Sequence, residues 1–282
     1  MKILIVGGTS SLAHALKPVL SEFAEVITAG RAGCDVHLDL NDPLENIVIP
    51  NGVDVVINTA AHFGGKEYEH IYQAENVNVQ GVLKLCKKCL KANVKHFVNI
   101  SSTSAYLTED SEYFGIYALS KKQSDELVKF FCSTFNLPYT ILRPSQLYGN
   151  DDSFRKHQPF LYTALDKAER SEDIGIYGAK DALRNYIHIN DFTKLIALVV
   201  INQVEGLYAC THAEDVSLSQ IAHAAIQAFG TEGRVIFQKN MADIPDNIFL
   251  YDDALYKRVN FFPQISIEEG MKRIATYRLT RL

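Results

Sequence analysis

The first half of the chain alternates short apolar runs with longer stretches of helical pattern, and this alternation restricts the fold more than any other feature. Five runs are bounded by Gly, Pro, Asn or Asp, as strands usually are: "KILIV" (2–6), "EVITA" (25–29), "DVVIN" (54–58), "HFVNI" (96–100) and "YTILR" (139–143). They are almost continuously apolar, as strands covered on both faces should be. Helical patterns run over 68–92 and 117–136. Strands separated by helices form βαβ crossovers, so the sequence predicts an α/β fold with a doubly wound parallel sheet.

The pattern changes after Arg143-Pro144, where a polar, turn-rich stretch begins. The rest of the chain offers two helices, "QPFLYTALDKAE" and "NDFTKLIALVVIN", then a strand "GLYAC", a helix "SLSQIAHAAIQAFG", a strand "RVIFQ" and a final helix near "SIEEGMKRIA". We therefore expect a larger domain and a smaller C-terminal α/β lobe, with ligands in the crevice at the carboxyl edge of the sheet. The expected larger domain comprises 1–150 with a return segment at 182–204, and the expected lobe comprises 151–181 and 205–282.

The charge balance excludes some partners. The chain has 28 basic and 33 acidic residues, a formal net charge of −5. It offers no basic patch of the kind that nucleic acids require, and no apolar segment of about 20 residues that would cross a membrane. The first apolar run stops at a glycine pair rather than at a cleavage-type site, so we expect a strand there and a cytoplasmic protein.

The five cysteines are scattered and odd in number, which argues against a disulfide framework. Cys86 and Cys89 form a lone CxxC within "VLKLCKKCLKA". No second pair and no nearby His accompanies them, so we interpret them as two small apolar residues on one helical face. No metal site is predicted.

A glycine pair follows the first run and opens a helical pattern, "GGTSSLAHAL" (7–16). A helix N-terminus presents free N–H groups and partial positive charge, which suits a pyrophosphate, and Gly7 and Gly8 permit close approach of the backbone. The usual three-glycine spacing, however, holds Gly7, Ser10 and Ala13. By itself this stretch is equally compatible with a dinucleotide site and with a tight turn into a helix.

The second run ends in "TAGRAG", where NAD-binding folds usually carry an Asp or Glu that accepts hydrogen bonds from the adenosine ribose. Here Gly30 occupies that position and Arg31 follows. A carboxylate would repel a 2′-phosphate, whereas an arginine pairs with it bidentately. The pattern favours NADP(H) over NAD(H), although an arginine exposed on a loop would look the same. "DVHLDL" (35–40) then offers Asp39 at the end of an expected third strand, where it would meet the adenine edge.

The strongest motif is "YALSK". Tyr117 and Lys121 are four residues apart on an expected helix, so they share a face. A nearby ammonium favours the phenolate, and we therefore expect Lys121 to lower the pKa of Tyr117. Such a tyrosine exchanges a proton with a carbonyl or alcohol oxygen during hydride transfer. Upstream, "NISSTSAY" ends a strand in hydroxyl groups, among which Ser102 could hold the same oxygen.

With these motifs in order, the chain resembles the extended short-chain dehydrogenases/reductases, of the NAD(P)-dependent epimerase/dehydratase type that acts on nucleotide sugars. The resemblance covers nearly the whole length. It rests on "GGTSSLA" (7–13), "NTAAH" (58–62), "NVNVQG" (76–81), "NISSTSAY" (99–106), "YALSK" (117–121), "LRPSQLYG" (142–149), "RNYIHIND" (184–191) and "GLYACTHAEDVSLSQIA" (206–222).

The resemblance implies a Rossmann fold and a set of site residues. Tyr117 would be the general acid/base, Lys121 would bind the nicotinamide ribose, Ser102 would orient the substrate oxygen, and Asn78 would kink its helix to hold a proton-relaying water. The implied cofactor contacts are Gly7, Thr9, Ser10, Ser11, Leu12, Gly30, Arg31, Asp39, Leu40, Asn58, Thr59, Ala60, Ala61, Asn76, Ile100, Ser101, Tyr117, Lys121 and Pro144. The implied substrate contacts are Thr103, Ser104, Gln146 and Arg184, the last on a sugar-nucleotide diphosphate.

Departures from the family pattern narrow the reaction. Related 4,6-dehydratases carry an Asp-Glu pair where this chain has Thr103 and Ser104. Related 3,5-epimerase/reductases carry a Cys and a His where it has Thr103 and Asp151. What remains is reduction of a keto-sugar or 4-epimerisation through a transient ketone. The Gly30-Arg31 pair favours an NADPH-dependent nucleotide-sugar ketoreductase, acting on a 4-keto-6-deoxyhexose, over a 4-epimerase with tightly bound NAD.

Two further expectations follow from the resemblance. The stretches 68–92 and 117–136 lie where many relatives pair subunits in a four-helix bundle, so a homodimer is expected. Leu119, Val128 and Phe131 would be buried in the core or in that interface. Some relatives bind a dinucleotide as sensors without turnover, but the complete Ser102, Tyr117 and Lys121 set argues against this alternative.

Overall fold

The computed structural model describes residues 1–281, and these fall into two units. The first unit contains Met1–Pro144, Thr193–Cys210 and Ala254–Asn260, and the second contains Ser145–Phe192, Thr211–Asp253 and the residues described from Phe261 onward. Residues 193–210 belong to the first unit. From the sequence we expected this return segment at 182–204, and we expected all residues from 205 onward in the smaller lobe. The physical reason for the difference is the apolar run "GLYAC", which pairs with a strand of the first unit.

The first unit is built on one seven-stranded sheet with the order β11-β6-β5-β4-β1-β2-β3, and every neighbouring pair is parallel. The strands are β1 (Lys2–Val6), β2 (Glu25–Gly30), β3 (Val36–His37), β4 (Val55–Asn58), β5 (His96–Ile100), β6 (Tyr139–Pro144) and β11 (Gly206–Cys210). The order changes direction at β1, which confirms the predicted doubly wound parallel sheet. β3 is shorter than the sequence suggested, and Asp39 follows it rather than ending it.

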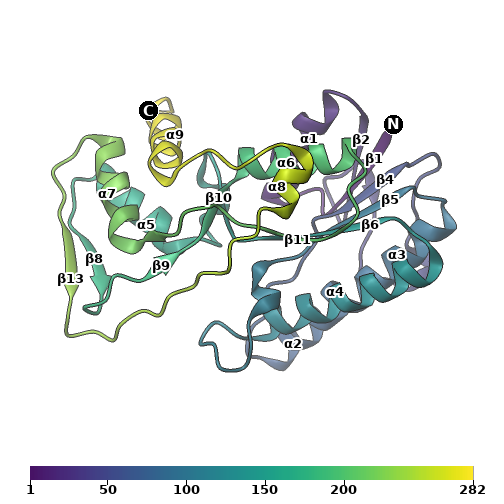
Figure 1. Ribbon diagram of the computed structural model, residues 1–282, viewed down its shortest axis with the longest axis horizontal. Coiled ribbons are helices and arrows are strands. Elements are labelled where there is room, and N and C mark those ends of the chain that lie inside the picture. The colour runs from purple at the N-terminus through teal and green to yellow at the C-terminus, as the bar shows by residue number, and fades with distance from the viewer. Residues whose placement is uncertain (282) are drawn as a thin grey trace. The chain divides into compact units, whose positions relative to one another are not determined.

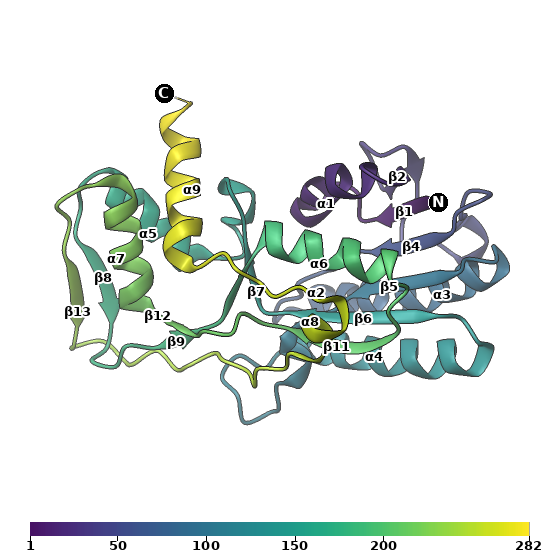
Figure 2. The same ribbon diagram turned by 45° about the horizontal axis from the view of Figure 1, so that its top comes forward.

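Helices cover both faces of this sheet (Figures 1 and 2). On one face lie α1 (Ser11–Ser21) and α6 (Ile189–Ile201). Only the part of α6 from Thr193 onward belongs to this unit. On the other face lie α2 (Tyr68–Glu75), α3 (Val82–Lys91) and α4 (Ile116–Phe135). The short helix α8 (Ala254–Val259) completes the unit, together with the 3-10 turns η1 (Leu44–Asn46) and η3 (Thr103–Tyr106).

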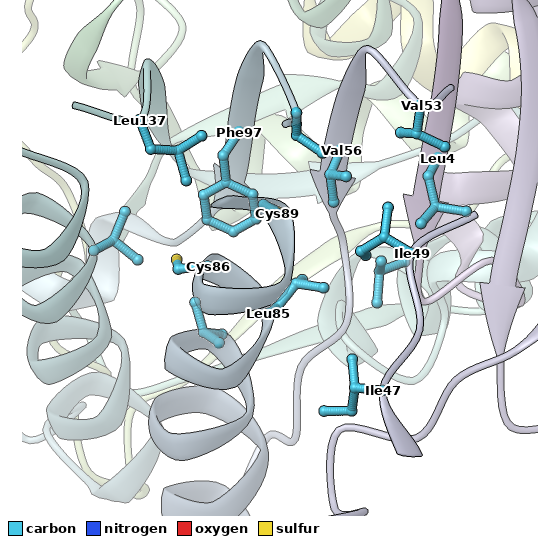
Figure 3. Packing of buried hydrophobic residues seen from close by; sticks show 14 of the residues in the cluster. Leu4, Ile47, Ile49, Val53, Val56, Leu85, Cys86, Cys89, Phe97 and Leu137 are labelled. Carbon is cyan, nitrogen blue, oxygen red and sulfur yellow. The ribbon is translucent and has the colours of Figure 1, made fainter. Parts of the chain in front are cut away.

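The hydrophobic core of the first unit lies between the sheet and the helices α3 and α4. Leu4, Val56 and Phe97 contribute from the strands and Leu85 from α3 (Figure 3). Cys86 and Cys89 are buried in the same cluster, as expected of small apolar residues on one helical face, and Cys132 of α4 is buried there too. Burial of their thiols raises the pKa of Cys86 and Cys89.

The second unit combines short strands with helices. Its strands pair as β7 (Gln146–Tyr148) with β10 (Tyr186–His188), β9 (Leu183–Arg184) with β12 (Val216–Ser217), and β8 (Ile174–Tyr177) with β13 (Val235–Gln238). The helices α5 (Pro159–Glu169), α7 (Leu218–Phe229) and α9 (Ile267–Leu279) pack on one another, and η4 (Asp152–Phe154) precedes α5. None of the helices within residues 1–281 is both long and apolar enough to cross a membrane.

Candidate active site

The turn between β1 and α1 packs tightly against neighbouring strand ends. The N–H groups of Gly7 and Gly8 both donate to the carbonyl of Ala29, at 2.9 and 3.0 Å. Gly7 has φ +82°, and a Cβ placed on it would lie 2.6 Å from the backbone nitrogen of Ala60. Only glycine fits this position, because the conformation is left-handed and the space is filled by backbone.

Ser10 caps the helix that the turn opens. Its Oγ accepts a hydrogen bond from the N–H of Ala13 at 3.1 Å and lies 3.0 Å from Oγ1 of Thr59, which in turn donates to the carbonyl of Val6. The first turn of α1 carries no acidic residue. The partial positive charge of this helix end is therefore not neutralised by the helix itself, which suits an anionic ligand.

The end of β2 is shaped by a thiol that the sequence did not single out. Cys34 is half-buried, and its Sγ would lie 2.9 Å from a Cβ placed on either Gly8 or Gly30. The sulfur thus occupies the space that a side chain at position 30 would need. Arg31, the next residue, is exposed.

The carboxylates near this strand end already accept hydrogen bonds from the chain. Asp35 Oδ2 accepts from the N–H and from the Oγ1 of Thr28, both at 2.8 Å, and these bonds hold the pKa of Asp35 below its usual value. Asp39 Oδ1 accepts from the N–H and the side-chain amide of Asn41, at 2.9 and 3.0 Å. Asn41 in turn accepts from Asn76 Nδ2 at 2.8 Å, which connects two of the predicted cofactor residues in one polar chain.

The remaining predicted cofactor residues of the first unit stand at the carboxyl ends of its strands. Because parallel strands end at one edge, this brings together segments far apart in the sequence. They are Thr9, Ser11 and Leu12 after β1, Leu40 after β3, Asn58, Thr59, Ala60 and Ala61 at the end of β4, Ile100 and Ser101 at the end of β5, and Pro144 at the end of β6. Their contacts with a cofactor stay predictions.

The strand end "NISSTSAY" and the "YALSK" helix meet as the motifs suggested. Tyr117 and Lys121 lie one turn apart on α4, with Lys121 Nζ 5.8 Å from the centre of the Tyr117 ring. Nζ donates to the carbonyl of Ile100 at 2.9 Å. A hydrogen bond joins the side chains of Ser102 and Tyr117. Ser102 Oγ also accepts from the N–H of Ser104 at 3.1 Å, so the hydroxyl is held at the start of η3.

The protonation of this pair differs from the expectation. Burial raises the pKa of Tyr117 to about 12, and the hydrogen bond from Ser102 only partly opposes this effect. Burial lowers the pKa of Lys121 to about 8, against the nearby charge of Asp125. The expectation that Lys121 lowers the pKa of Tyr117 is therefore wrong for the protein alone, because removal of the phenol from water raises this pKa and the nearby charge of Asp125 raises it further.

Asn78 fixes the loop after β4. It lies in η2 (Asn76–Gly81), a π-helical turn between α2 and α3, which agrees with the expected distortion of its helix. Its Nδ2 donates to the carbonyl of His62 at 2.8 Å and to Ser120 Oγ at 3.0 Å, and its Oδ1 accepts from the N–H of His62 at 2.8 Å. The amide thereby holds the backbone next to Phe63.

Phe63 covers the proposed catalytic tyrosine and was not found by sequence reasoning. Its ring stacks on that of Tyr117, with the centres 5.0 Å apart and the planes 18° from parallel. Its own surface is 53% exposed. An apolar residue on a glycine-rich loop gives no sign in the sequence of such a contact.

The predicted substrate residues divide between the units. In the first unit, Thr103 is buried and Ser104 is half-buried in η3. In the second unit, Gln146 donates to Oε1 of Gln158 at 3.1 Å. Arg184 is buried, and its Nη1 donates to the carbonyls of Leu183 and Pro245 at 2.7 and 2.9 Å. Its proposed contact with a diphosphate stays a prediction. Residues 1–281 hold no group of three or more His, Cys, Asp or Glu side chains placed to bind a metal ion.

The sequence profile of the NAD dependent epimerase/dehydratase family matches residues 3–208, well over half of the chain. The chain belongs to this family. A putative UDP-glucose 4-epimerase of Methanocaldococcus jannaschii is 23% identical to it over 254 residues, which cover 86% of this chain and 83% of that protein. A GDP-L-fucose synthase of Azorhizobium caulinodans is 24% identical over 314 residues, covering 99% of this chain and 96% of that one.

Solved structures share the fold of this family member. The UDP-glucose 4-epimerase of Thermotoga maritima, solved with UDP-glucose, superposes with a TM-score of 0.80 at 20% identity, over 100% of this chain and 99% of that chain. The UDP-glucose 4-epimerase of Thermus thermophilus, solved in complex with NAD, gives 0.78 at 18% identity over 100% of both chains. Family and fold confirm the resemblance to extended short-chain dehydrogenases/reductases and the expectation of an NAD(P)-dependent enzyme.

Proposed function

We propose that this family member is an NADPH-dependent ketoreductase of nucleotide sugars, which reduces the keto group of a 4-keto-6-deoxyhexose. The observation that carries the proposal is the end of β2. Gly30 provides no carboxylate there, the sulfur of Cys34 fills the space, and Arg31 is exposed beside it. The neighbouring Asp35 is bonded to Thr28. An exposed guanidinium without a competing carboxylate suits a 2′-phosphate.

The residues present fit a dinucleotide. The close backbone approach at Gly7 and the N-terminus of α1, with no acid in its first turn, offer N–H groups to a pyrophosphate. When bound, the reduced nicotinamide supplies the hydride. The chain's own residues supply the proton and the orientation.

Tyr117 suits the role of proton donor. Burial raises its pKa to about 12, so its phenol, like that of an exposed tyrosine, is protonated at neutral pH and can donate to a carbonyl oxygen as that oxygen gains negative charge. Ser102, bonded to the same phenol, would hold the oxygen in place. Lys121 beside the ring would stabilise the phenolate that forms. A protonated phenol is the form required for reduction, whereas oxidation of an alcohol begins from a base.

A nucleotide sugar is the substrate that the relatives suggest. The solved epimerase of Thermotoga maritima carries UDP-glucose, and the Methanocaldococcus jannaschii and Azorhizobium caulinodans relatives are named for a UDP-sugar and a GDP-sugar. In this proposal Thr103, Ser104 and Gln146 contact the sugar and Arg184 contacts the diphosphate. The five free cysteines agree with the reducing conditions of the cytoplasm, where we place the protein.

A homodimer through α2 and α4 is part of the proposal. Large apolar side chains are exposed on these helices, among them Tyr68 (73%), Tyr72 (55%) and Phe130 (73%). Of the three residues expected to be buried, Val128 lies in the core, Phe131 packs partly against it, and Leu119 is 37% exposed. Light scattering after size exclusion tests the dimer, and Phe130→Glu should yield monomers if these faces pair.

The second candidate function is 4-epimerisation with tightly bound NAD, which the names of several relatives favour. One experiment separates the two. The protein is mixed with NADPH or NADH and a panel of dTDP-, GDP-, UDP- and CDP-keto-sugars, and absorbance at the nicotinamide band is followed. A ketoreductase consumes NADPH in proportion to the sugar reduced. No consumption with any member, together with interconversion of UDP-hexoses by protein that carries NAD from purification, would replace the proposal with the epimerase.

A further inference from the structure

A carboxylate lies completely buried next to the Tyr117–Lys121 pair. Asp125 stands one helical turn beyond Lys121 and two beyond Tyr117 on α4, so all three share a face. Its exposure is 0%, and burial raises its pKa. Arg143, Ser101 and Lys121 act in the opposite direction and lower this pKa. A charged carboxylate in such a place is costly unless it is paired and hydrogen-bonded.

Asp125 accepts hydrogen bonds from residues at the ends of two neighbouring strands. Its Oδ2 accepts from Ser101 Oγ, at the end of β5, at 2.7 Å and from Arg143 Nε, in β6, at 2.8 Å. Arg143 is itself buried, and its guanidinium lies 4.4 Å from the centre of the Tyr106 ring. Oδ1 of Asp125 has no hydrogen-bond partner among residues 1–281. A well-packed apolar pair would usually stabilise a core at least as well as a buried ion pair, so stability alone does not account for this arrangement.

The group that gains from this charge is Lys121. Burial lowers the pKa of Lys121 to about 8, and the charge of Asp125 acts in the opposite direction. The titratable or charged groups around the pair are Tyr117 on the same helix, Tyr106 in η3, and Arg143 in β6. None of these three groups is a carboxylate. The carbonyl of Ile100 orients Nζ at 2.9 Å but carries no net charge.

We propose that Asp125 is a positioning residue of the active site, whose buried carboxylate keeps Lys121 an ammonium and, through Ser101 and Arg143, fixes the strand ends on which Lys121 and Ser102 depend. This inference rests on the proposed roles of Tyr117 and Lys121 and adds a requirement to them. A neutral amine would not stabilise the phenolate left when Tyr117 gives up its proton. A purely structural Asp125–Arg143 pair would instead contribute to stability and leave the protonation of Lys121 unchanged.

The test is the titration of Lys121 in the protein without cofactor or substrate. Protein labelled with ¹³C and ¹⁵N at lysine side chains is titrated by NMR, and the Lys121 signal is assigned by its loss in Lys121→Arg. Asp125→Asn keeps the size and polarity of the side chain but removes its charge. We expect the midpoint of Lys121 to fall by about one pH unit or more, a tenfold loss of proton affinity, and Asp125→Glu to restore most of it. An unchanged midpoint in folded Asp125→Asn overturns the proposal.

A second variant keeps the proposal testable if Asp125→Asn does not fold. Asp125→Asn leaves the Arg143 guanidinium buried without its partner, so the double variant Asp125→Asn/Arg143→Gln removes both charges. Its Lys121 midpoint should again lie below that of the wild type, but by less than in Asp125→Asn, because the repulsion by Arg143 is also absent. Failure of both variants to fold would assign Asp125 to the core alone and contradict the inference. The pH profile of kcat should change as well. In Asp125→Asn its alkaline limit should move to lower pH by as much as the Lys121 midpoint does. Because the NMR titration needs no substrate, its result is independent of whether the keto-sugar panel supports the proposed reaction.

Discussion

Tyr117 is the residue whose removal should affect the reaction most directly. Tyr117→Phe keeps the ring that stacks on Phe63 but removes the hydroxyl bonded to Ser102. Loss of a positioned proton donor should lower kcat roughly a hundredfold or more, while NADPH binding changes little. Stopped-flow absorbance for turnover and nicotinamide fluorescence for binding measure the two effects separately. Turnover at the wild-type rate would show that another group donates the proton.

Arg31 should decide between the two dinucleotides. Arg31→Ala removes a guanidinium proposed to pair with the 2′-phosphate, a charge-assisted contact of about 1.5–3 kcal/mol. We therefore expect the dissociation constant of NADPH to rise about tenfold or more, with that of NADH nearly unchanged. Arg170→Ala, an exposed arginine of the second unit paired with Glu172, serves as the control. Equal weakening of both dinucleotides by Arg31→Ala would remove the basis for an NADP(H) preference.

The residues found from the sequence and those missed differ in kind. Tyr117, Lys121 and Ser102 were found because each belongs to a short motif whose spacing already implies its chemistry. Phe63, Cys34 and Asp125 were missed because their importance comes from contacts between segments far apart in the chain. The pKa of Tyr117 was misjudged for the same reason, since the cost of burial is set by the surrounding fold rather than by the neighbour four residues away.

At the scale of elements, η2 should control the loop that carries Phe63. Asn78→Ala removes the two hydrogen bonds that hold the backbone of His62 and the one to Ser120. The loop should then open more often, so the amide hydrogen of His62 should exchange about tenfold faster, as expected from the loss of roughly 1.5 kcal/mol. Hydrogen exchange followed by NMR measures this directly.

Asn76→Ala is a matched control within the same π-helical turn. Its amide bonds to Asn41 and makes no bond to the loop, so exchange at His62 should stay as in the wild type. Equal acceleration in both variants would mean that the whole turn had loosened, and the specific clamp by Asn78 would be disproved.

The bounds of the strands were predicted well where a strand coincides with an apolar run in the sequence. β1 and β5 agree with the expected runs at both ends, and β2, β4 and β6 differ by one residue at one end. The sequence did not predict which strand pairs with "GLYAC" (β11), because the apolar pattern of this segment fits an edge strand of either unit. In the structure β11 pairs in parallel with β6. The family resemblance implied a kink at Asn78, but not that it takes the form of a π-helical turn. Periodicity did not reveal the turn either, since one extra residue in a helix hardly alters its pattern.

At the scale of the whole molecule, the stability of the second unit should depend on a charge cluster that no local pattern reveals. Arg278, on α9, is only 7% exposed at its side chain. It pairs with Asp152 at 2.6 Å and with Asp166 and Glu169, each at 3.0 Å. These partners lie more than a hundred residues away in the chain, so the cluster fastens the last helix to η4 and α5.

Arg278→Met should therefore lower the free energy of unfolding by about 2 kcal/mol. Removing one partner of a buried ion pair costs more, about 3–5 kcal/mol, but the three carboxylates here are 28–42% exposed and can be rehydrated. Arg273→Met is the control on the same helix, because Arg273 makes only a surface pair with Glu269 at 2.8 Å, worth about 0.3–0.5 kcal/mol. Urea unfolding followed by circular dichroism measures both. If the two variants lose the same small amount, the cluster does not hold α9 in place, and apolar packing of the helix accounts for its attachment.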